Sequence, residues 1–418
     1  MSGVDGAADL RPSGAMAPPL RGVLVLALEQ AVSGPLASRL LLDQGATVVK
    51  VERPGAGDFA RHYEHHSAGV SSYFAWLNHG KQSVALDLKT PHGRDIAHAL
   101  AERADVVVQN YAPGAAGRLG LGPRQLRRRR PELVYGSISG YGERGSYTER
   151  KAYDLLVQAE AGVIAVTGEP GRLAKAGVSL CDIASGTALA AGILGALVAR
   201  GAGRGGATLS VSMFEATLDW TAPTLGLYLS TGVEPAPVGL HHLHAAPYGP
   251  FPCGDGGLLV LCAQHDREWR DLCLRAFDRP DLAADERFVT TERRMRHRAE
   301  LHAAIEAVLA TDGAESWERR VVAAGLACAR LRSVAEVADH PVVHERNLLQ
   351  EVHTEQGTAR TPVQPIRSSA ATLGGGPRVP SVGEHTDRWL RRLGYTAGER
   401  RDLYRTGAAA APVTAARR

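Results

Sequence analysis

The sequence predicts an α/β protein in which a Rossmann-like layer, a parallel β-sheet covered by helices, is followed by a smaller domain. Two observations carry this prediction. In the first third of the chain, short apolar runs bounded by turn-prone residues alternate with helix-like stretches of about 10–15 residues, a pattern typical of parallel sheets. The chain is also 418 residues long, well beyond the ~150 residues of an average domain, so a second domain is expected.

The expected elements follow one another along the chain. Residues 23–26 read as a buried parallel strand, because four apolar residues are bounded by turns. The next segments are a helix at 36–44, strands at 46–51, 105–109 and 133–137, a helix at 93–103 and a long helix ending near Arg200. The pattern then changes to a glycine-rich linker at 201–206, a helix at 211–229, turns and strands at 240–262, charged helices at 266–330 and, from Pro341, extended and then helical segments.

Composition excludes several classes of protein. Hydrophobic residues make up 44% and charged residues 22%, as in an ordinary soluble enzyme. The net charge of +4 is too small for a nucleic-acid-binding surface. The longest apolar run, 188–199, has 12 residues, whereas a membrane span needs roughly 18, so no membrane partner is expected. Five cysteines without a CxxC pair suggest neither a disulfide framework nor a zinc knuckle, and a cytoplasmic location is expected.

Cofactor motifs are missing from the places where they would be informative. The turn after the first strand, 28–35, has one glycine and no GxGxxG fingerprint, which disfavours nicotinamide or flavin binding in the usual geometry. The P-loop, the HExxH zinc motif and the GxSxG nucleophile elbow are also missing from the sequence. We therefore expect no tightly bound cofactor.

Two basic residues follow predicted strand ends. Arg53 in the segment 50–54 and Lys89 in the segment 86–89 are placed at strand ends, in positions that line the ligand crevice of α/β sheets. They are candidates for holding phosphates, although exposed surface charges are the commoner explanation of such residues.

Asp182 is the carboxylate that stands out, because it precedes a long apolar helix in the segment 179–186. One interpretation is a helix N-cap. The other is a nucleophile, since backbone amides at a helix start would keep the carboxylate ionised and would stabilise oxyanions. The cluster His241, His242 and His244 has no accompanying carboxylate, so a metal site is not expected there.

Several short motifs, taken in order, resemble the class III CoA-transferases, the family of formyl-CoA transferase, carnitine CoA-transferase and α-methylacyl-CoA racemase. The resemblance extends over about residues 20–403. Its landmarks are the segments 33–35, 50–53, 86–89, 110–118, 139–142, 181–186, 211–215 and 383–386.

The resemblance implies that Asp182 is the catalytic aspartate and that coenzyme A or acyl-CoA is a substrate. The implied CoA contacts are Arg53, Leu86, Lys89, Asn110, Tyr111, Arg118 and Lys151. It further implies a homodimer of two interlocked chains and a large Rossmann-like domain built from both ends of the chain, beside a smaller α+β domain. The expected division is a disordered leader 1–19, large domain 20–200, linker 201–225, small domain 226–335, return to the large domain 336–407 and disordered tail 408–418.

Departures from the family pattern narrow the expected activity. Val32 stands where formyl-CoA transferase has a glutamine, and the tetraglycine loop of that enzyme is missing, so formate or oxalate is not expected as a substrate. Racemases have a histidine at the position of Tyr153, and a phenol with a pKa near 10 is a poor partner for proton exchange, so transfer is favoured over racemisation. The segments 151–162 and 246–251 resemble the dicarboxylate branch, which uses succinyl-, itaconyl- or mesaconyl-CoA.

In that branch Tyr153, Asp154 and His242 are expected to contact the substrate. Two alternatives to a transferase stay open from the sequence: an isomerase acting at the α-carbon of an acyl-CoA, and a CoA-binding protein without catalytic activity.

Overall fold

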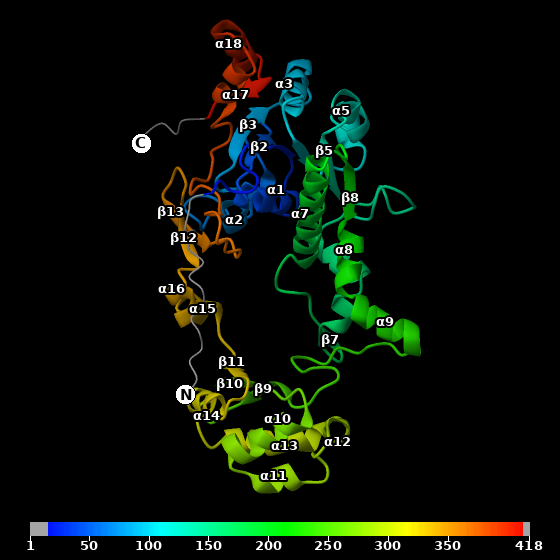
Figure 1. Ribbon diagram of the computed structural model, residues 1–418, viewed down its shortest axis with the longest axis vertical. Helices are drawn as coiled ribbons and strands as arrows, with labels where there is room; N and C mark the ends of the chain where they lie inside the picture. Colours follow the sequence, from blue (N-terminus) through cyan, green and yellow to red (C-terminus); the bar gives the residue numbers. More distant parts are fainter. Residues whose placement is uncertain (1–15, 413–418) are drawn as a thin grey trace. The chain divides into compact units, whose positions relative to one another are not determined.

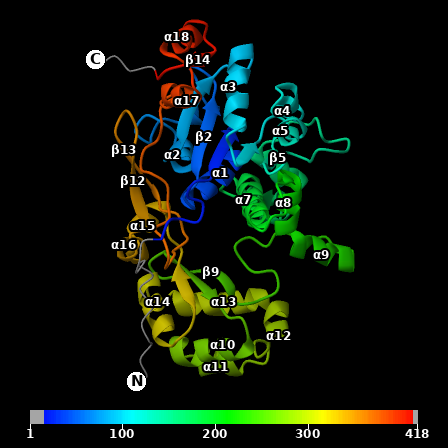
Figure 2. The same ribbon diagram turned by 45° about the horizontal axis from the view of Figure 1, so that its top comes forward.

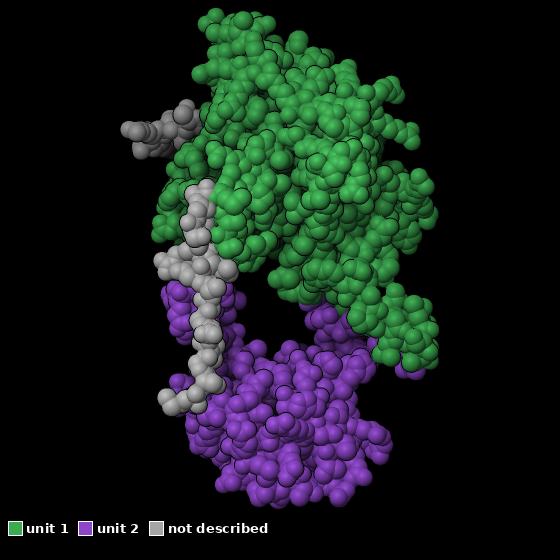
Figure 3. All heavy atoms as spheres, in the orientation of Figure 1, with its two compact units in different colours: residues 1–163, 176–232, 347–418 green, residues 164–175, 233–346 purple. Residues whose placement is uncertain are grey.

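The computed structural model describes residues 16–412, and these divide into two compact units (Figure 3). Unit 1 comprises residues 1–163, 176–232 and 347–418, so it contains both ends of the chain. Unit 2 comprises residues 164–175 and 233–346.

Unit 1 alternates strands and helices for most of its length (Figure 1). Its first elements are β1 (Leu24–Leu28), α1 (Ser33–Asp43), β2 (Thr47–Glu52), η1 (Phe59–His62), α2 (Ser72–Asn78), β3 (Gln82–Leu86), α3 (Pro91–Ala101), β4 (Val106–Gln109), α4 (Ala115–Arg118), α5 (Pro123–Arg129) and β5 (Val134–Ser139). They are followed by α6 (Asp154–Glu160), α7 (Leu180–Gly201), β8 (Thr208–Ser212), α8 (Met213–Trp220), α9 (Ala222–Thr231), β12 (Leu349–His353), β13 (Thr358–Pro362), α17 (Thr386–Arg392), α18 (Ala397–Arg405) and β14 (Ala409–Ala410).

The central sheet of unit 1 has seven strands in the order β14-β3-β2-β1-β4-β5-β8. Every neighbouring pair is parallel except β14 with β3, where Ala409 pairs with Leu86. The strand order reverses between β1 and β4, and in open α/β sheets the carboxyl edge at such a point is where ligands bind.

Helices cover both faces of this sheet (Figures 1 and 2). On one face Leu26, Val49 and Val84 pack against α3, α5, α17 and α18. On the other face Val25 and Val48 pack against α1, α6, α7 and α8. Because side chains alternate along a strand, the apolar residues of β1 pack into the cores on both faces of the sheet.

Helix α7 is long and apolar enough to cross a membrane by length and composition alone, although 39% of its apolar window is buried inside the structure. The apolar run 188–199, which the sequence analysis judged too short for a membrane span, lies within this helix. Its residues Leu189, Ala190 and Ile193 lie in the core against the sheet. A core helix of this kind is only weak evidence for a membrane protein.

Unit 2 combines a three-stranded antiparallel sheet, in the order β11-β10-β9, with a group of helices. Its core includes Trp269, Phe288 and Trp317. Its elements are η2 (Ile164–Val166), β6 (Gly168–Glu169), β7 (Arg172–Leu173), β9 (Tyr248–Pro252), β10 (Leu258–Cys262), α10 (Asp266–Asp271), the π-helical η3 (Leu272–Phe277), α11 (Pro280–Ala284), α12 (Thr291–Arg296), α13 (Arg298–Leu309), α14 (Ala314–Ala323), β11 (Cys328–Arg330), α15 (Val334–Ala338) and α16 (Pro341–Glu345).

The unit boundaries differ from the expected division at several points. Residues 226–232, which were expected in the small domain, complete α9 in unit 1. Residues 336–346, which were expected in the large domain, belong to unit 2. Residues 164–175 also belong to unit 2, although they lie within the expected first segment of the large domain. The expected linker 201–225 contains the edge strand β8 and two helices, and the helix predicted to begin at Val211 begins at Met213. The alternation Thr-Leu-Ser-Val-Ser at 208–212 has the two-residue period of a strand, which explains this difference.

The expected disordered tail is wrong for residues 408–410. The Asp87 N–H donates to the carbonyl oxygen of Ala408 at 2.9 Å, and β14 closes the sheet edge. At the other end, residues 1–15 of the expected leader lie outside the described residues, as do 413–418 of the tail. The described chain is already tied down at Pro18, whose carbonyl oxygen accepts the Arg21 N–H at 2.9 Å.

Candidate functional site

Parallel pairing brings the expected site residues of unit 1 to one edge of its sheet. Arg53 follows β2, Lys89 lies three residues beyond β3, and Asn110 follows β4. The carboxyl ends of parallel strands meet at the same edge, so these residues lie where an open α/β sheet binds its ligands. Arg53, Lys89, Arg118 and Lys151 are all exposed.

Asp182 is the third residue of α7 and therefore not its N-cap. The N-cap is Ser179, whose side chain makes no capping hydrogen bond. The N-cap interpretation of Asp182 is wrong by this geometry, because an N-cap residue lies outside the helical backbone and Asp182 lies within it.

The carboxylate of Asp182 is held by the neighbouring helix α1. Ser33, the first residue of α1, donates hydrogen bonds to it from its side chain and from its backbone N–H. Burial, and to a smaller extent the nearby Asp154, raise the pKa of Asp182 to about 7, while the bonds from Ser33 act in the opposite direction. The side chain is therefore partly protonated at neutral pH, which corrects the expectation of a fully ionised carboxylate.

The backbone amides at the start of α7 are engaged by Asp154. Its Oδ1 accepts the Cys181 N–H at 2.8 Å and the Asp182 N–H at 3.4 Å, and its Oδ2 accepts from Gln158 at 2.6 Å. The amides that were expected to stabilise oxyanions at Asp182 thus face a second carboxylate. The donors that face Asp182 come from Ser33.

Gly186 allows α1 to approach α7 this closely, and Gly34 allows α1 to approach Asn110 after β4. A Cβ atom on Gly186 would lie 2.6 Å from the carbonyl oxygen of Ser33, and one on Gly34 would lie 3.0 Å from Asn110. Real Cβ atoms do not approach backbone at the first distance, so a larger residue at 186 would force the two helices apart. Gly186 lies one helical turn beyond Asp182, on the same face of α7.

Three of the expected CoA contacts take structural roles in the described chain. Asn110 bonds to the β1–α1 turn, accepting the Gln30 N–H at 2.9 Å and donating to the Gln30 carbonyl oxygen at 2.8 Å. Leu86 is 1% exposed, so any contact it makes with a ligand comes from its backbone. Tyr111 packs against the core, and burial raises the pKa of its phenol to about 12.

Tyr153 is 64% exposed and precedes α6. Burial is the largest of the effects that raise the pKa of the Tyr63 phenol to about 12. Asp58, Asp182 and Tyr153 act in the same direction. The charge of Asp182 thus acts on Tyr63, which was not predicted from the sequence as a site residue.

A group of aromatic residues lies near the start of α7. Tyr63 packs edge-on against Phe59 and Tyr73, and the Tyr73 hydroxyl lies 3.3 Å from the Ser179 hydroxyl at the start of α7. The signal for this group was present in the sequence. Five aromatic residues fall between positions 59 and 76 of a chain that is only 5% aromatic.

The histidine cluster lies in unit 2. The His242 ring stacks on Tyr248 with centroids 4.8 Å apart, and its Nδ1 accepts the His244 N–H at 3.1 Å. His241 packs against His302, and burial lowers the pKa of both rings. Across residues 16–412 no group of three or more His, Cys, Asp or Glu side chains is arranged to hold a metal ion.

A doubly wound sheet with basic residues at its carboxyl edge and a half-buried aspartate at a helix start places this chain among the α/β proteins that bind a ligand at the sheet edge. Comparison with known proteins names the family. The family model described as CoA-transferase family III matches residues 20–386, and the chain belongs to that family. It is an enzyme of the CoA-transferase class, as the sequence resemblance indicated.

Similar proteins share the whole length of the fold. The acetyl-CoA:oxalate CoA-transferase of Acetobacter aceti is 35% identical over 84% of this chain and 89% of its own. The succinyl-CoA:mesaconate CoA-transferase of Haloarcula hispanica is 33% identical over 90% of this chain and 97% of its own. A solved CAIB/BAIF family protein from Brucella suis superposes with a TM-score of 0.81 at 30% identity, covering 90% of this chain and 100% of the other.

Proposed function

We propose that this enzyme transfers CoA from a donor thioester such as succinyl-CoA to a dicarboxylic acid such as itaconate or mesaconate, with Asp182 as the covalent nucleophile. The observation that carries the proposal is the Asp182 carboxylate itself, held by Ser33 at the start of α1. The similarity to succinyl-CoA:mesaconate CoA-transferase supports the dicarboxylate acceptor.

The chemistry follows from a carboxylate nucleophile. Ionised Asp182 attacks the thioester carbonyl, a mixed anhydride forms and CoA leaves as its thiolate. The thiolate then attacks the Asp182 carbonyl carbon, which releases the donor acid and leaves an aspartyl-CoA thioester. The acceptor carboxylate attacks this thioester, which forms a second anhydride and expels CoA thiolate again. This thiolate attacks the acceptor carbonyl of the anhydride, which forms the product thioester and frees Asp182. Ser33 donates to the Asp182 carboxyl group, whose oxygen gains negative charge when thiolate attacks its carbon.

Trapping with hydroxylamine tests the covalent step. Wild-type enzyme incubated with succinyl-CoA and then hydroxylamine should carry a hydroxamate on Asp182, identified by peptide mass mapping. Asp182→Asn should carry none and should lose transfer by several orders of magnitude, since an amide is a far weaker nucleophile. Asp154→Asn is the matched control, because it removes the nearest second carboxyl group. A hydroxamate on Asp154, or substantial transfer by Asp182→Asn, overturns the mechanism.

The pKa of Asp182 favours a second candidate function. A carboxyl group that titrates near pH 7 suits proton abstraction at the α-carbon of an acyl-CoA. Incubation of an acyl-CoA in deuterated water distinguishes the two functions. Exchange at the α-carbon without an acceptor acid supports the isomerase, and its absence beside efficient CoA transfer supports the transferase.

We also propose that two chains associate as an interlocked homodimer. The apolar helix α9 has no buried residue in the described chain. It exposes Leu229 and Tyr228, and Trp220 at the end of the preceding helix α8 is exposed as well. An exposed apolar surface of this kind is typical of a subunit interface. Light scattering after gel filtration should give twice the chain mass.

A further inference from the structure

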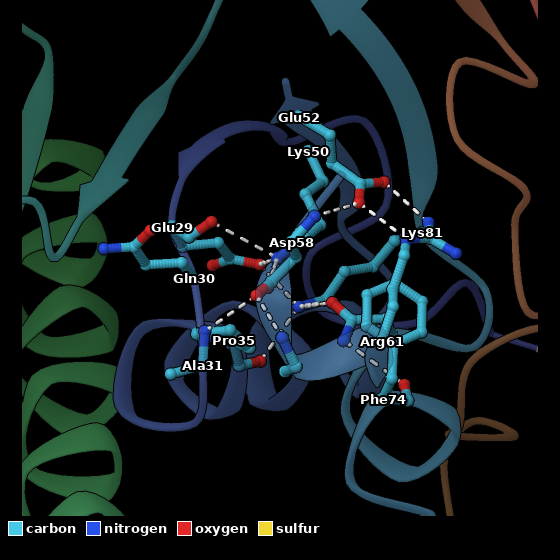
Figure 4. A network of polar contacts seen from close by, with 12 residues as sticks. Glu29, Gln30, Ala31, Pro35, Lys50, Glu52, Asp58, Arg61, Phe74 and Lys81 are labelled. Atoms are coloured by element: carbon cyan, nitrogen blue, oxygen red, sulfur yellow. Dashed lines mark hydrogen bonds and ion pairs between the residues drawn. The ribbon is translucent and has the colours of Figure 1, made fainter. Parts of the chain in front are cut away.

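Beneath the β1–α1 turn lies a buried cluster of three carboxylates and three cations (Figure 4). Its members lie in β2, in η1 and in the segments that connect the elements of unit 1, and they are Glu29, Lys50, Glu52, Asp58, Arg61 and Lys81. Charged side chains are rarely buried to this degree, because removing them from water costs free energy, so a buried charged cluster suggests a specific role.

Contacts within the cluster converge on the turn that carries Ser33. Lys81 Nζ donates to Glu29 Oε1 at 2.7 Å and to the carbonyl oxygen of Pro35 at 2.9 Å. Lys50 Nζ lies 2.9 Å from Asp58 Oδ2 and 3.5 Å from Glu29 Oε1. Burial lowers the pKa of Lys81 to about 8, so the ammonium group stays charged at neutral pH.

Asp58 bonds to the backbone of the β1–α1 turn. Its Oδ1 accepts the N–H of Ala31 at 3.1 Å and that of Ala60 at 3.0 Å. Ala31 has φ 63°, a left-handed conformation that a residue with a Cβ adopts only where its surroundings impose it. Asp58 on one side and Asn110 on the other therefore clamp the backbone two residues before Ser33.

Asp58 also lies in the segment that begins with Arg53, the expected contact for a CoA phosphate. The packing of this segment on the cluster is tight, since a Cβ on Gly57 would lie 2.7 Å from Glu52 Oε2. Asp58 thus joins the loop expected to hold CoA to the turn that holds Asp182.

We propose that Asp58 is a positioning residue for CoA transfer, which keeps Ser33 in place against Asp182 through the Ala31 amide. The proposal rests on the proposed function, because it assigns Asp58 to the reaction of Asp182. It predicts that disturbing Asp58 lowers kcat more than it alters the binding of acyl-CoA.

Asp58→Asn is the first test, because all partners of the carboxylate are hydrogen-bond donors and an amide must point its own NH₂ at one of them. We expect kcat to fall about tenfold or more while KM for succinyl-CoA changes by less than about threefold. Asp43→Asn is the matched control. Asp43 is equally buried and ion-paired with Arg39, but lies at the opposite end of α1. It should lose stability and keep its kcat.

Asp58→Asn leaves the buried Lys50 ammonium without its ion-pair partner, so this variant can fail to fold. Two double variants test the proposal in that case. Asp58→Asn/Lys50→Met and Asp58→Ala/Lys50→Met both lack the ion pair and differ in whether residue 58 offers an oxygen to Ala31. A kcat several-fold higher for the Asn form supports positioning.

Equal kcat values in the two double variants, or wild-type kcat in a folded Asp58→Asn, overturn positioning and leave the proposed function intact. A wild-type enzyme that transfers CoA to no acid overturns the proposed function itself, and with it the reaction that Asp58 would serve.

Discussion

Asp154 lies against the first turn of α7 and accepts the backbone N–H of Asp182 at 3.4 Å. Two carboxyl groups therefore share one helix start. Asp154 takes the amides of α7, and Asp182 is left with the donors of Ser33 and with a like charge beside it. This arrangement, together with burial, brings the pKa of Asp182 to about 7.

The rate of CoA transfer should therefore depend on pH near neutrality. The attacking form of Asp182 is ionised, so kcat/KM should rise as the pH increases through about 7, the pKa of that carboxyl group. Initial rates measured between pH 5 and 9 at low succinyl-CoA check this. A flat profile across that range would falsify the assignment of this pKa to the nucleophile.

Asp154→Asn provides the control for the profile. The amide oxygen keeps an acceptor for the Cys181 N–H, while the like charge disappears. The acid limb should move to lower pH and remain above the value of an exposed aspartate near 3.9, because burial is the larger cause of the shift.

Asp182→Asn should be more stable relative to the wild type at high pH than at low pH. A carboxyl group with a folded pKa of about 7 and an unfolded value of 3.8 holds its proton in the folded state between these values, so stability is lost as the pH rises through this window. The limit is about 4 kcal/mol at 1.36 kcal/mol per pKa unit, reduced by partial solvent exposure. Thermal unfolding of both proteins at pH 4 and pH 8 measures it, and a Tm difference independent of pH would contradict the shift.

Arg53, Lys89 and Arg118 should contribute to acyl-CoA binding through charge-assisted contacts to its phosphates. Each change to Ala should raise KM for the thioester about tenfold and leave kcat within about threefold of the wild type. Arg319→Ala removes an equal charge from the exposed face of α14 in unit 2 and should leave both constants unchanged. Unaltered KM in all three variants would remove these residues from the site.

The acceptor should be a dicarboxylate. In a panel with succinyl-CoA and acetyl-CoA as donors, itaconate, mesaconate or succinate should be preferred over a monocarboxylate of similar length. Oxalate belongs in the panel, because a similar protein is named as an acetyl-CoA:oxalate CoA-transferase while the sequence pattern disfavours that acid here. A marked preference for formate, carnitine or a fatty acid would contradict the dicarboxylate assignment.

Local pattern was enough to predict the strands β1, β2, β4 and β5 within a few residues, because a buried parallel strand is a continuous apolar run whatever its neighbours are. It also placed Arg53 and Lys89 shortly after strands, and the family resemblance selected Asp182. The short β14 was missed, since two alanines acquire strand structure only by pairing with β3.

The electrostatics of the site could not be predicted from the sequence. Nothing local to Asp182 shows that Asp154, 28 residues earlier, takes the helix amides, or that Ser33 supplies the donors. The buried cluster was equally hidden, because Glu29 and Lys81 are 52 residues apart in the chain and each looks like a surface charge when taken alone.

The sequence by itself thus determined which segments are strands and helices and which aspartate matches the family's nucleophile, because periodicity and motifs are properties of neighbouring residues. Tertiary structure decided the pKa of that aspartate. Burial, like charge and hydrogen-bond donors act over a few ångströms in space, and here the groups concerned come from α1, α6 and α7, elements that meet only when the sheet has formed.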